Sequence, residues 1–140
     1  MKALDKALLR ELIGAIGDAQ HKLRELGQLS EQAFLADFRN TESAKYLLIV
    51  ASEAAIDICN HIAARQEGRA PEDYADCFEV LVELQILDPK FAERLQQMAR
   101  FRNLLVHVYQ KVDNRRVYQF IHTSLNDLDA YREVIAGLIL

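Results

Sequence analysis

Residues 41 to 66 constrain the fold more than any other segment, because they are apolar on nearly every side of a helix. A helix of this kind is buried, so other elements must surround it. The whole chain has only 5 Gly and 2 Pro in 140 residues, a composition that favours helices elsewhere as well. The sequence therefore predicts an all-α fold that is built round a central helix.

Helical periodicity continues through the rest of the chain. Leu and Ile at three- and four-residue steps predict a first amphipathic helix that ends near Gly27. Ser30 is the expected N-cap of a short helical piece, and Asn40 or Thr41 is that of the central helix. The expected helices cover residues 4–27, 30–38, 40–66, 74–87, 88–111 and 117–140. We expect one domain over residues 1–140, an antiparallel bundle of four main helices with short connections.

Charge is distributed unevenly along the chain. The net charge is −4, which argues against a protein that binds nucleic acid over its whole surface. However, residues 94–122 contain six basic residues and one acidic residue, about +5 in total, which leaves about −9 for the remainder. A local basic patch can attract a phosphate chain. A helix end that is simply solvated would carry the same charges.

Both ends of the chain and its cysteines indicate a cytoplasmic protein that does not enter membranes. The start, "MKALDKALLRELIG", places charges among apolar residues at helical spacing, unlike a signal peptide. The apolar end, "VIAGLIL", is too short to span a bilayer. Cys59 and Cys77 lie in apolar surroundings without zinc-type spacing, which fits a reducing compartment.

Four polar side chains interrupt the apolar segment "RFRNLLVHVYQK", which starts at residue 100. They are Arg102, Asn103, His107 and Tyr109, and buried polar groups are costly unless they are paired or used. At about 100° per residue, Arg102 and Tyr109 share one helix face, whereas Arg102 and His107 lie about 140° apart. A cleft between two copies of this helix would bring the groups together. Alternatively, Arg and His near a helix end could simply cap carbonyl groups.

Such a cleft has the chemistry to cut RNA. A neutral imidazole can take a proton from a ribose 2′-hydroxyl, and an imidazolium can donate one to the leaving 5′-oxygen. A guanidinium can bind the scissile phosphate through two hydrogen bonds and stabilise the charge that develops on it. His107 and Arg102 are the candidates for these two roles.

A second polar stripe lies on the central helix, where Glu53, Asp57 and His61 follow one another at four-residue steps. The stripe is either a solvated, mutually satisfied edge or the side of a cleft, in which Asp57 orients a neighbouring imidazole or arginine. Metal binding is not expected. His21 follows Asp18 by three residues, but the chain contains no Glu-x-x-His pair of the kind that metal-binding bundles use.

The segment "RNLLVHVY", residues 102–109, resembles the R-x-x-x-x-H-x-Y motif of HEPN-domain toxins of the HepT family. Further segments resemble that family in order and spacing. They are "IDICNHIAA", "GRAPEDYADCFEVL", "MARFRNLLVHVY" and "VYQFI". The similarity spans roughly residues 45–131. A lone R-x-x-x-x-H would be weak, but four linked segments make a strong signal.

The resemblance implies a homodimeric, HEPN-like bundle of four to five helices, the toxin of a type VII toxin–antitoxin system. It implies a metal-independent RNA endonuclease without cofactors, in which Arg102 and His107 cleave and Asn103 shapes the site. The expected products are a 2′,3′-cyclic phosphate and a 5′-hydroxyl. It also implies a nucleotidyltransferase antitoxin that transfers AMP to Tyr109. Glu53 stands where we would expect an uncharged polar residue, so its role is open.

The basic residues that follow the motif, Lys111, Arg115 and Arg116, are expected to contact RNA phosphates without reading bases. Two other functions compete with the toxin ribonuclease. One is a non-catalytic HEPN-like module that binds a nucleotide or a nucleotidyltransferase partner, and the other is a plain helical adaptor. The intact pair of Arg102 and His107 favours the ribonuclease, because a scaffold does not need both.

Overall fold

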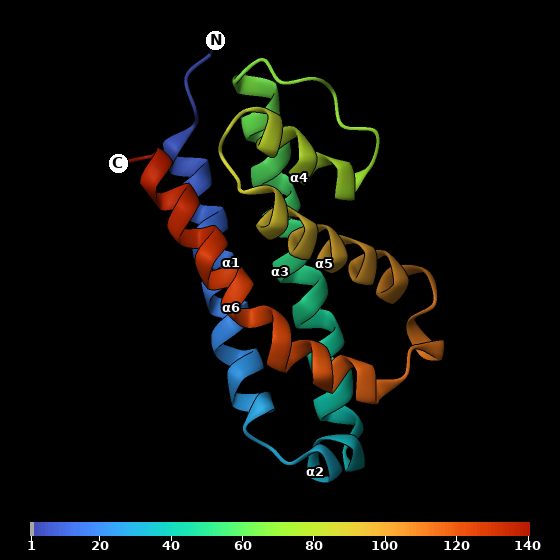
Figure 1. Cartoon of the computed structure of the whole chain (residues 1–140). Helices are drawn as coiled ribbons and strands as arrows, with labels where there is room; N and C mark the ends of the chain where they lie inside the picture. The colour runs from blue at the N-terminus through green and yellow to red at the C-terminus, as the bar shows by residue number, and fades with distance from the viewer. Residues whose placement is uncertain (1) are drawn as a thin grey trace.

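The computed structural model describes residues 2–140, and every regular element in that range is a helix. The elements are α1 (Lys6–Gly27), α2 (Glu31–Ala36), α3 (Phe38–Arg65), α4 (Tyr74–Glu83), α5 (Pro89–His107), the single 3-10 turn η1 (Tyr109–Lys111) and α6 (Asn114–Leu138). Figure 1 shows α1 and α6 side by side, with α4 and α5 on the other side of α3. The predicted all-α bundle is confirmed, with α2 as its short piece.

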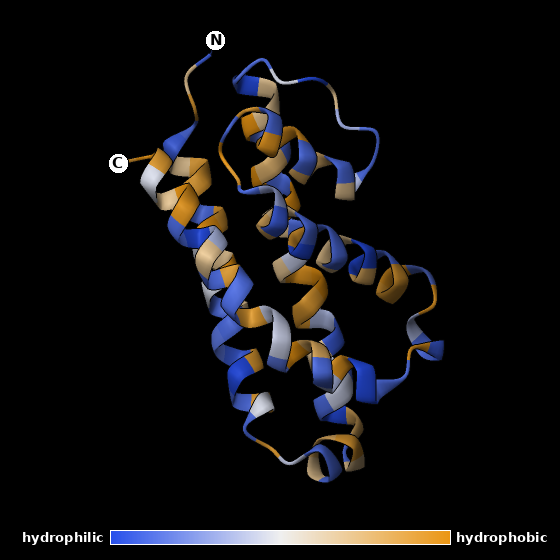
Figure 2. Cartoon of the chain, in the orientation of Figure 1, coloured by the Kyte–Doolittle hydropathy of each residue, from blue (hydrophilic) through white to orange (hydrophobic). Residues whose placement is uncertain are grey.

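Helix α3 is the central helix, as its apolar sequence predicts. It packs against α1, α2, α4, α5 and α6, and Figure 2 shows hydrophobic residues, in orange, in its middle. Helix α3 is long and apolar enough to cross a membrane, but most of its apolar stretch is buried inside the bundle. Its hydrophobicity is therefore accounted for by the core.

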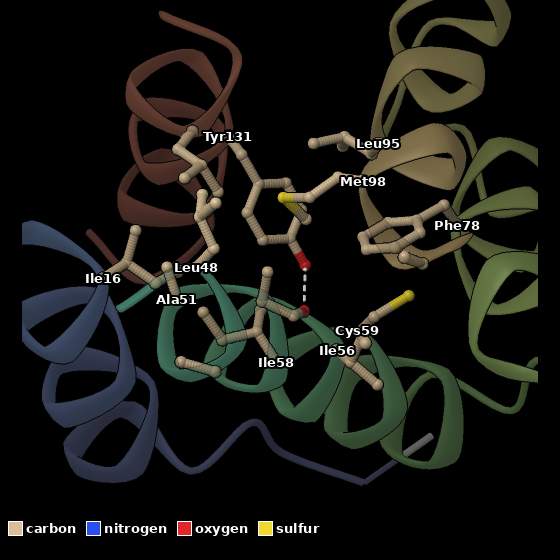
Figure 3. Packing of buried hydrophobic residues seen from close by; sticks show 14 of the residues in the cluster. Ile16, Leu48, Ala51, Ile56, Ile58, Cys59, Phe78, Leu95, Met98 and Tyr131 are labelled. Carbon is tan, nitrogen blue, oxygen red and sulfur yellow. Dashed lines mark hydrogen bonds between the residues drawn. The ribbon is translucent and has the colours of Figure 1, made fainter. Parts of the chain in front are cut away.

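Figure 3 shows how α6 is fixed onto α3 in this core. Tyr131 is completely buried, and its hydroxyl donates a 2.9 Å hydrogen bond to the Ala55 carbonyl oxygen. Its ring meets Phe78 of α4 edge-on, with the centroids 5.8 Å apart. Because the phenol has a partner, its burial does not leave a polar group unsatisfied. Burial raises the pKa of Tyr131 well above its ordinary value.

The helix starts follow side-chain caps, with one difference from the sequence-based prediction. Ser30 caps α2, as expected, and Asp88 caps α5. The central helix, however, is capped by Asp37, whose carboxylate accepts a 2.9 Å hydrogen bond from the Arg39 backbone N–H. The prediction of Asn40 or Thr41 was therefore wrong. A single extended residue separates α2 from α3, so the long helix starts earlier than the sequence suggested.

The end of α5 and the start of α6 also differ from expectation. Helix α5 ends at His107, because Val108 adopts a non-helical conformation (φ −131°, ψ 38°). The chain then makes the η1 turn, and α6 begins at Asn114 rather than 117, with Asp113 as its N-cap. Residues 114–116, which lie between the two helices expected from the sequence, therefore form the first turn of α6. This break decides where the last residues of the motif lie.

Candidate functional site

Arg102 is held by groups from three helices. One guanidinium nitrogen, Nη2, donates a 2.7 Å hydrogen bond to Oε1 of Glu53 on α3. A second nitrogen, Nη1, donates to Oδ1 of the adjacent Asn103 at 3.0 Å. The guanidinium carbon lies 5.0 Å from the ring centroid of Tyr74 at the start of α4, within the range of a cation–π contact. Only 13% of the Arg102 side chain is exposed, so the group is positioned before any ligand arrives.

A pocket of about 290 Å³ opens beside this guanidinium, between α3, α4 and α5. It is lined by Glu53, Asp57, Asn60, Tyr74, Ile56 and Arg102. Burial raises the pKa of the Asp57 carboxyl, and the negative charge of Glu53 raises it further. In one of the two interpretations of the stripe, Asp57 orients a neighbouring imidazole or arginine, but Glu53, one turn earlier, makes the ion pair with Arg102. The pairing gives Glu53 the structural role that the sequence left open.

His61, the last member of the predicted stripe, lies elsewhere. Its Nε2 accepts a 3.0 Å hydrogen bond from the backbone N–H of Asp5, near the start of α1. Burial lowers the pKa of His61, as does the positive charge of Arg65, while Asp5 opposes both. His61 does not line the pocket beside Arg102. The expectation that His61 supports the cleft is therefore not met.

His107 is the last residue of α5 and is exposed to solvent. Because α5 is unbroken from Arg102 to His107, the predicted separation of about 140° round the helix holds. The valines on either side, Val106 and Val108, are exposed at 43% and 36%. Within one chain, therefore, Arg102 and His107 point in different directions.

Tyr109 does not share a helix face with Arg102, and this expectation is corrected by the break at Val108. Tyr109 lies in η1, and its hydroxyl donates a 3.3 Å hydrogen bond to the Glu42 carbonyl oxygen near the start of α3. Burial raises the pKa of Tyr109 to about 12, and the neighbouring Glu42 contributes to the shift. The phenol is therefore neutral near pH 7 and faces α3 rather than the guanidinium.

Lys45, one turn after Glu42 on α3, also contacts Tyr109. It is a buried lysine, 3% exposed, on the central helix. Its Nζ donates a 3.1 Å hydrogen bond to the Tyr109 carbonyl oxygen and lies 4.7 Å from the ring centroid. Glu42 Oε1 is 3.7 Å from the same ammonium group. Sequence reasoning missed Lys45, although a charged residue inside an apolar helix is a usable signal of a local partner.

The basic residues after the motif are all exposed. The guanidinium carbon of Arg116 lies 5.1 Å from the ring centroid of Phe101, whereas Lys111 and Arg115 project from η1 and the start of α6. Within residues 2–140, none of these three cations is ion-paired with a carboxylate. The same range holds no group of three or more His, Cys, Asp or Glu side chains that could bind a metal ion.

A helical bundle that carries Arg102 and His107 on one helix, followed by Tyr109, has the architecture of a HEPN-domain protein. Comparison with known families identifies the group more closely. The family model described as "Ribonuclease HepT-like" matches residues 16–135. The chain therefore belongs to the HepT-like ribonuclease family, as the motif indicated.

Curated relatives carry the same name. The chain is 28% identical over 140 residues to a tRNA nuclease HepT of Aphanizomenon flos-aquae, covering 99% of this chain and 95% of that protein. It is 30% identical over 102 residues to an mRNA nuclease HepT of Shewanella oneidensis, covering 73% and 77%.

Solved structures share the fold. One is the tri-AMPylated Shewanella oneidensis HEPN toxin in complex with an MNT antitoxin, with a TM-score of 0.85 and 26% identity over 93% of this chain and 97% of that one. Another is a toxin–antitoxin complex with AMP-PNP, with a TM-score of 0.83 and 26% identity over 91% and 97%. The cytosolic protein YutE of Bacillus subtilis, 18% identical with a TM-score of 0.83, shares the fold alone.

Proposed function

We propose that this protein is the toxin of a toxin–antitoxin pair and cuts RNA through Arg102, Asn103 and His107. One observation supports the proposal most: a guanidinium fixed by Glu53 and Asn103 lies on the same helix as an exposed terminal imidazole. A fixed guanidinium suits phosphate binding, because little order is lost when the ligand arrives. Because the chain belongs to a ribonuclease family, we take RNA as the phosphate-containing substrate.

The proposed reaction is an internal transfer within RNA. Neutral His107 takes the proton of a ribose 2′-hydroxyl, and the freed oxygen attacks the adjacent phosphorus. The bond from phosphorus to the 5′-oxygen breaks, and that oxygen takes up the proton that His107 gained from the 2′-hydroxyl. Arg102 stabilises the charge on the phosphoryl oxygens. The products are a 2′,3′-cyclic phosphate and a 5′-hydroxyl, and no metal or other cofactor takes part.

The reaction centre is proposed to form between two copies of the chain. Arg102 and His107 diverge on one helix, so a two-fold pairing of α5 with its copy supplies the missing partner. Val106 and Val108 flank His107 and are exposed, which suits such an interface. Light scattering at micromolar concentration should give the mass of a dimer. A fully active monomer would refute this arrangement.

The antitoxin is proposed to be a nucleotidyltransferase that attaches AMP to Tyr109. The AMPylated state of a structural relative supports this idea. A phosphodiester on Tyr109 would lie next to the Lys45 ammonium, which already contacts the ring, and the attached nucleotide would obstruct RNA. Co-expression with the antitoxin should add one or more AMP units to Tyr109 and silence cleavage. Tyr109→Phe should fold normally and gain no mass. If the antitoxin silenced this variant as fully as the parent, simple binding would explain the control.

The direct test is cleavage of labelled RNA by purified protein in the presence of EDTA. The parent should cut, and either His107→Ala or Arg102→Ala should lower the rate by roughly 10²-fold or more, because each removes acid–base chemistry or charge stabilisation. Circular dichroism should show that both variants keep the helical fold. Equal rates for parent and both variants would refute the site.

One observation favours a second function. The carboxylate of Glu53 already occupies Arg102, as in a purely structural ion pair. A non-catalytic module that binds a nucleotide or a nucleotidyltransferase would keep such a pair. The same RNA assay separates the two functions, because the module would bind its partner and leave RNA uncut at every protein concentration.

A further inference from the structure

A groove of about 600 Å³ lies between α5 and α6, apart from the pocket beside Arg102. Arg94 and Arg100 approach it from α5, and Arg116 from the first turn of α6. Figure 1 shows these two helices joined through η1 at one side of the molecule. The groove is large enough for part of an extended ligand rather than a single ion.

The groove carries positive charge that the protein leaves uncompensated. Arg94 pairs with Asp127 at 2.9 Å. Arg100 and Arg116 are both exposed, and neither has a carboxylate partner within residues 2–140. Two free guanidinium groups on one groove favour a ligand with several negative charges, such as a chain of phosphates.

The floor of the groove is aromatic. The rings of Phe101 and Phe120 lie 4.4 Å apart between centroids, at an angle of 35°, and Arg116 lies over Phe101. Phe120 is only partly buried and lines the groove. An aromatic face beside cations is what proteins use to stack bases of a single strand, since bases in a duplex are already stacked.

The groove is aligned with the proposed imidazole. Arg100 and His107 are seven residues apart on the unbroken helix α5, so they lie within about 20° of one face and about 10 Å apart along the axis. Arg102, by contrast, lies about 140° from His107. An RNA strand held in the groove would therefore run toward His107.

We infer that this groove binds single-stranded RNA next to the reaction centre, with Arg100 and Arg116 on consecutive phosphates and Phe120 against a base. The inference rests on the proposed ribonuclease function. It adds a substrate-holding site to the cleavage motif, and a preference for unpaired RNA. Short substrates that end before the groove gain nothing from it.

The test measures binding in a background that cannot cut. Fluorescence anisotropy of a labelled single-stranded RNA compares His107→Ala protein with and without the double change Arg100→Gln and Arg116→Gln. The double change should weaken binding roughly tenfold or more and lower the slope of log affinity against log salt by about 1.4, since each phosphate contact on a single strand contributes about 0.7. A control pair of exposed cations on α1, Arg10→Gln with Lys22→Gln, removes equal charge and should leave the slope unchanged.

A second pair of variants, Arg100→Lys with Arg116→Lys, retains the charge and should recover most of the affinity. The groove assignment is overturned if the groove and control pairs weaken binding equally. It is also overturned if the groove pair spares RNA binding but loses the antitoxin or the dimer, since the groove would then bind protein. If the His107→Ala protein binds no RNA and the parent cuts none, the proposed ribonuclease function fails as well. If the parent cuts RNA but the groove variants bind it as tightly as the His107→Ala protein does, only the groove assignment fails.

Discussion

Arg102 depends on neighbours that lie far away in the sequence. Its ion pair with Glu53 joins positions 49 residues apart, and Tyr74 comes from a third helix. Glu53 has two opposite effects on a phosphate ligand. It fixes the guanidinium in place, but its negative charge opposes a phosphate at the same spot. These two effects can be separated by substitution.

Glu53→Gln keeps a hydrogen-bond acceptor for Arg102 and removes the charge, so KM for RNA should fall while kcat stays within a few-fold of the parent value. Glu53→Ala removes both and frees the guanidinium, so kcat should fall by roughly tenfold. Steady-state kinetics on one RNA substrate measures both. Parent-like kcat and KM in both variants would show that Glu53 does not position Arg102.

Asp57 should make stability depend on pH. Its pKa is raised, by burial first and then by Glu53, so the folded protein prefers the protonated carboxyl. Ionisation of Asp57 therefore lowers stability as pH rises above the ordinary value of 3.8. Asp57→Asn should raise Tm at about pH 7 and make no difference at about pH 3, where the carboxyl is protonated in both states. A lower Tm at neutral pH would contradict the environment described for Asp57.

The packing of elements explains both what the sequence could predict and what it could not. Apolar periodicity reports which face of a helix is buried, so α1, α3 and the bundle followed from it. The ends of helices depend on single residues. The break at Val108 has no breaker residue, and it turned Tyr109 toward α3. The partners Glu53 and Lys45 depend on how helices pack, which one sequence read alone does not show.

Docking of α6 on α3 should depend measurably on one hydroxyl. Tyr131→Phe removes the buried hydrogen bond to Ala55 and should cost about 1 kcal/mol of unfolding free energy. The Ala55 carbonyl remains in the helix, so the loss should not approach that of an unpaired buried group. Tyr118→Phe is the matched control, because the Tyr118 hydroxyl donates a hydrogen bond to the Leu29 carbonyl oxygen at a partly buried site. This substitution should lower the unfolding free energy by less. Urea unfolding compares the two, and a larger loss for Tyr118→Phe would contradict this ranking.

At the scale of the whole molecule, the fold distributes the proposed functions over different sides of α5. The guanidinium of Arg102 opens onto the pocket between α3, α4 and α5, while the basic groove opens between α5 and α6. His107 ends the helix, and Tyr109 follows it against α3. A single copy thus presents the pieces of a ribonuclease without joining them. A second copy of α5 is needed to bring Arg102 and His107 together.

The most direct test is complementation between two inactive variants. Arg102→Ala and His107→Ala chains, co-expressed with different tags, are purified as mixed dimers and assayed on labelled RNA in EDTA. If the site joins Arg102 of one copy to His107 of the other, the mixed dimer keeps one intact combination, and it should cut RNA well above either variant alone. A mixed dimer as inactive as its parents, beside a parent protein that cuts, would contradict a shared site.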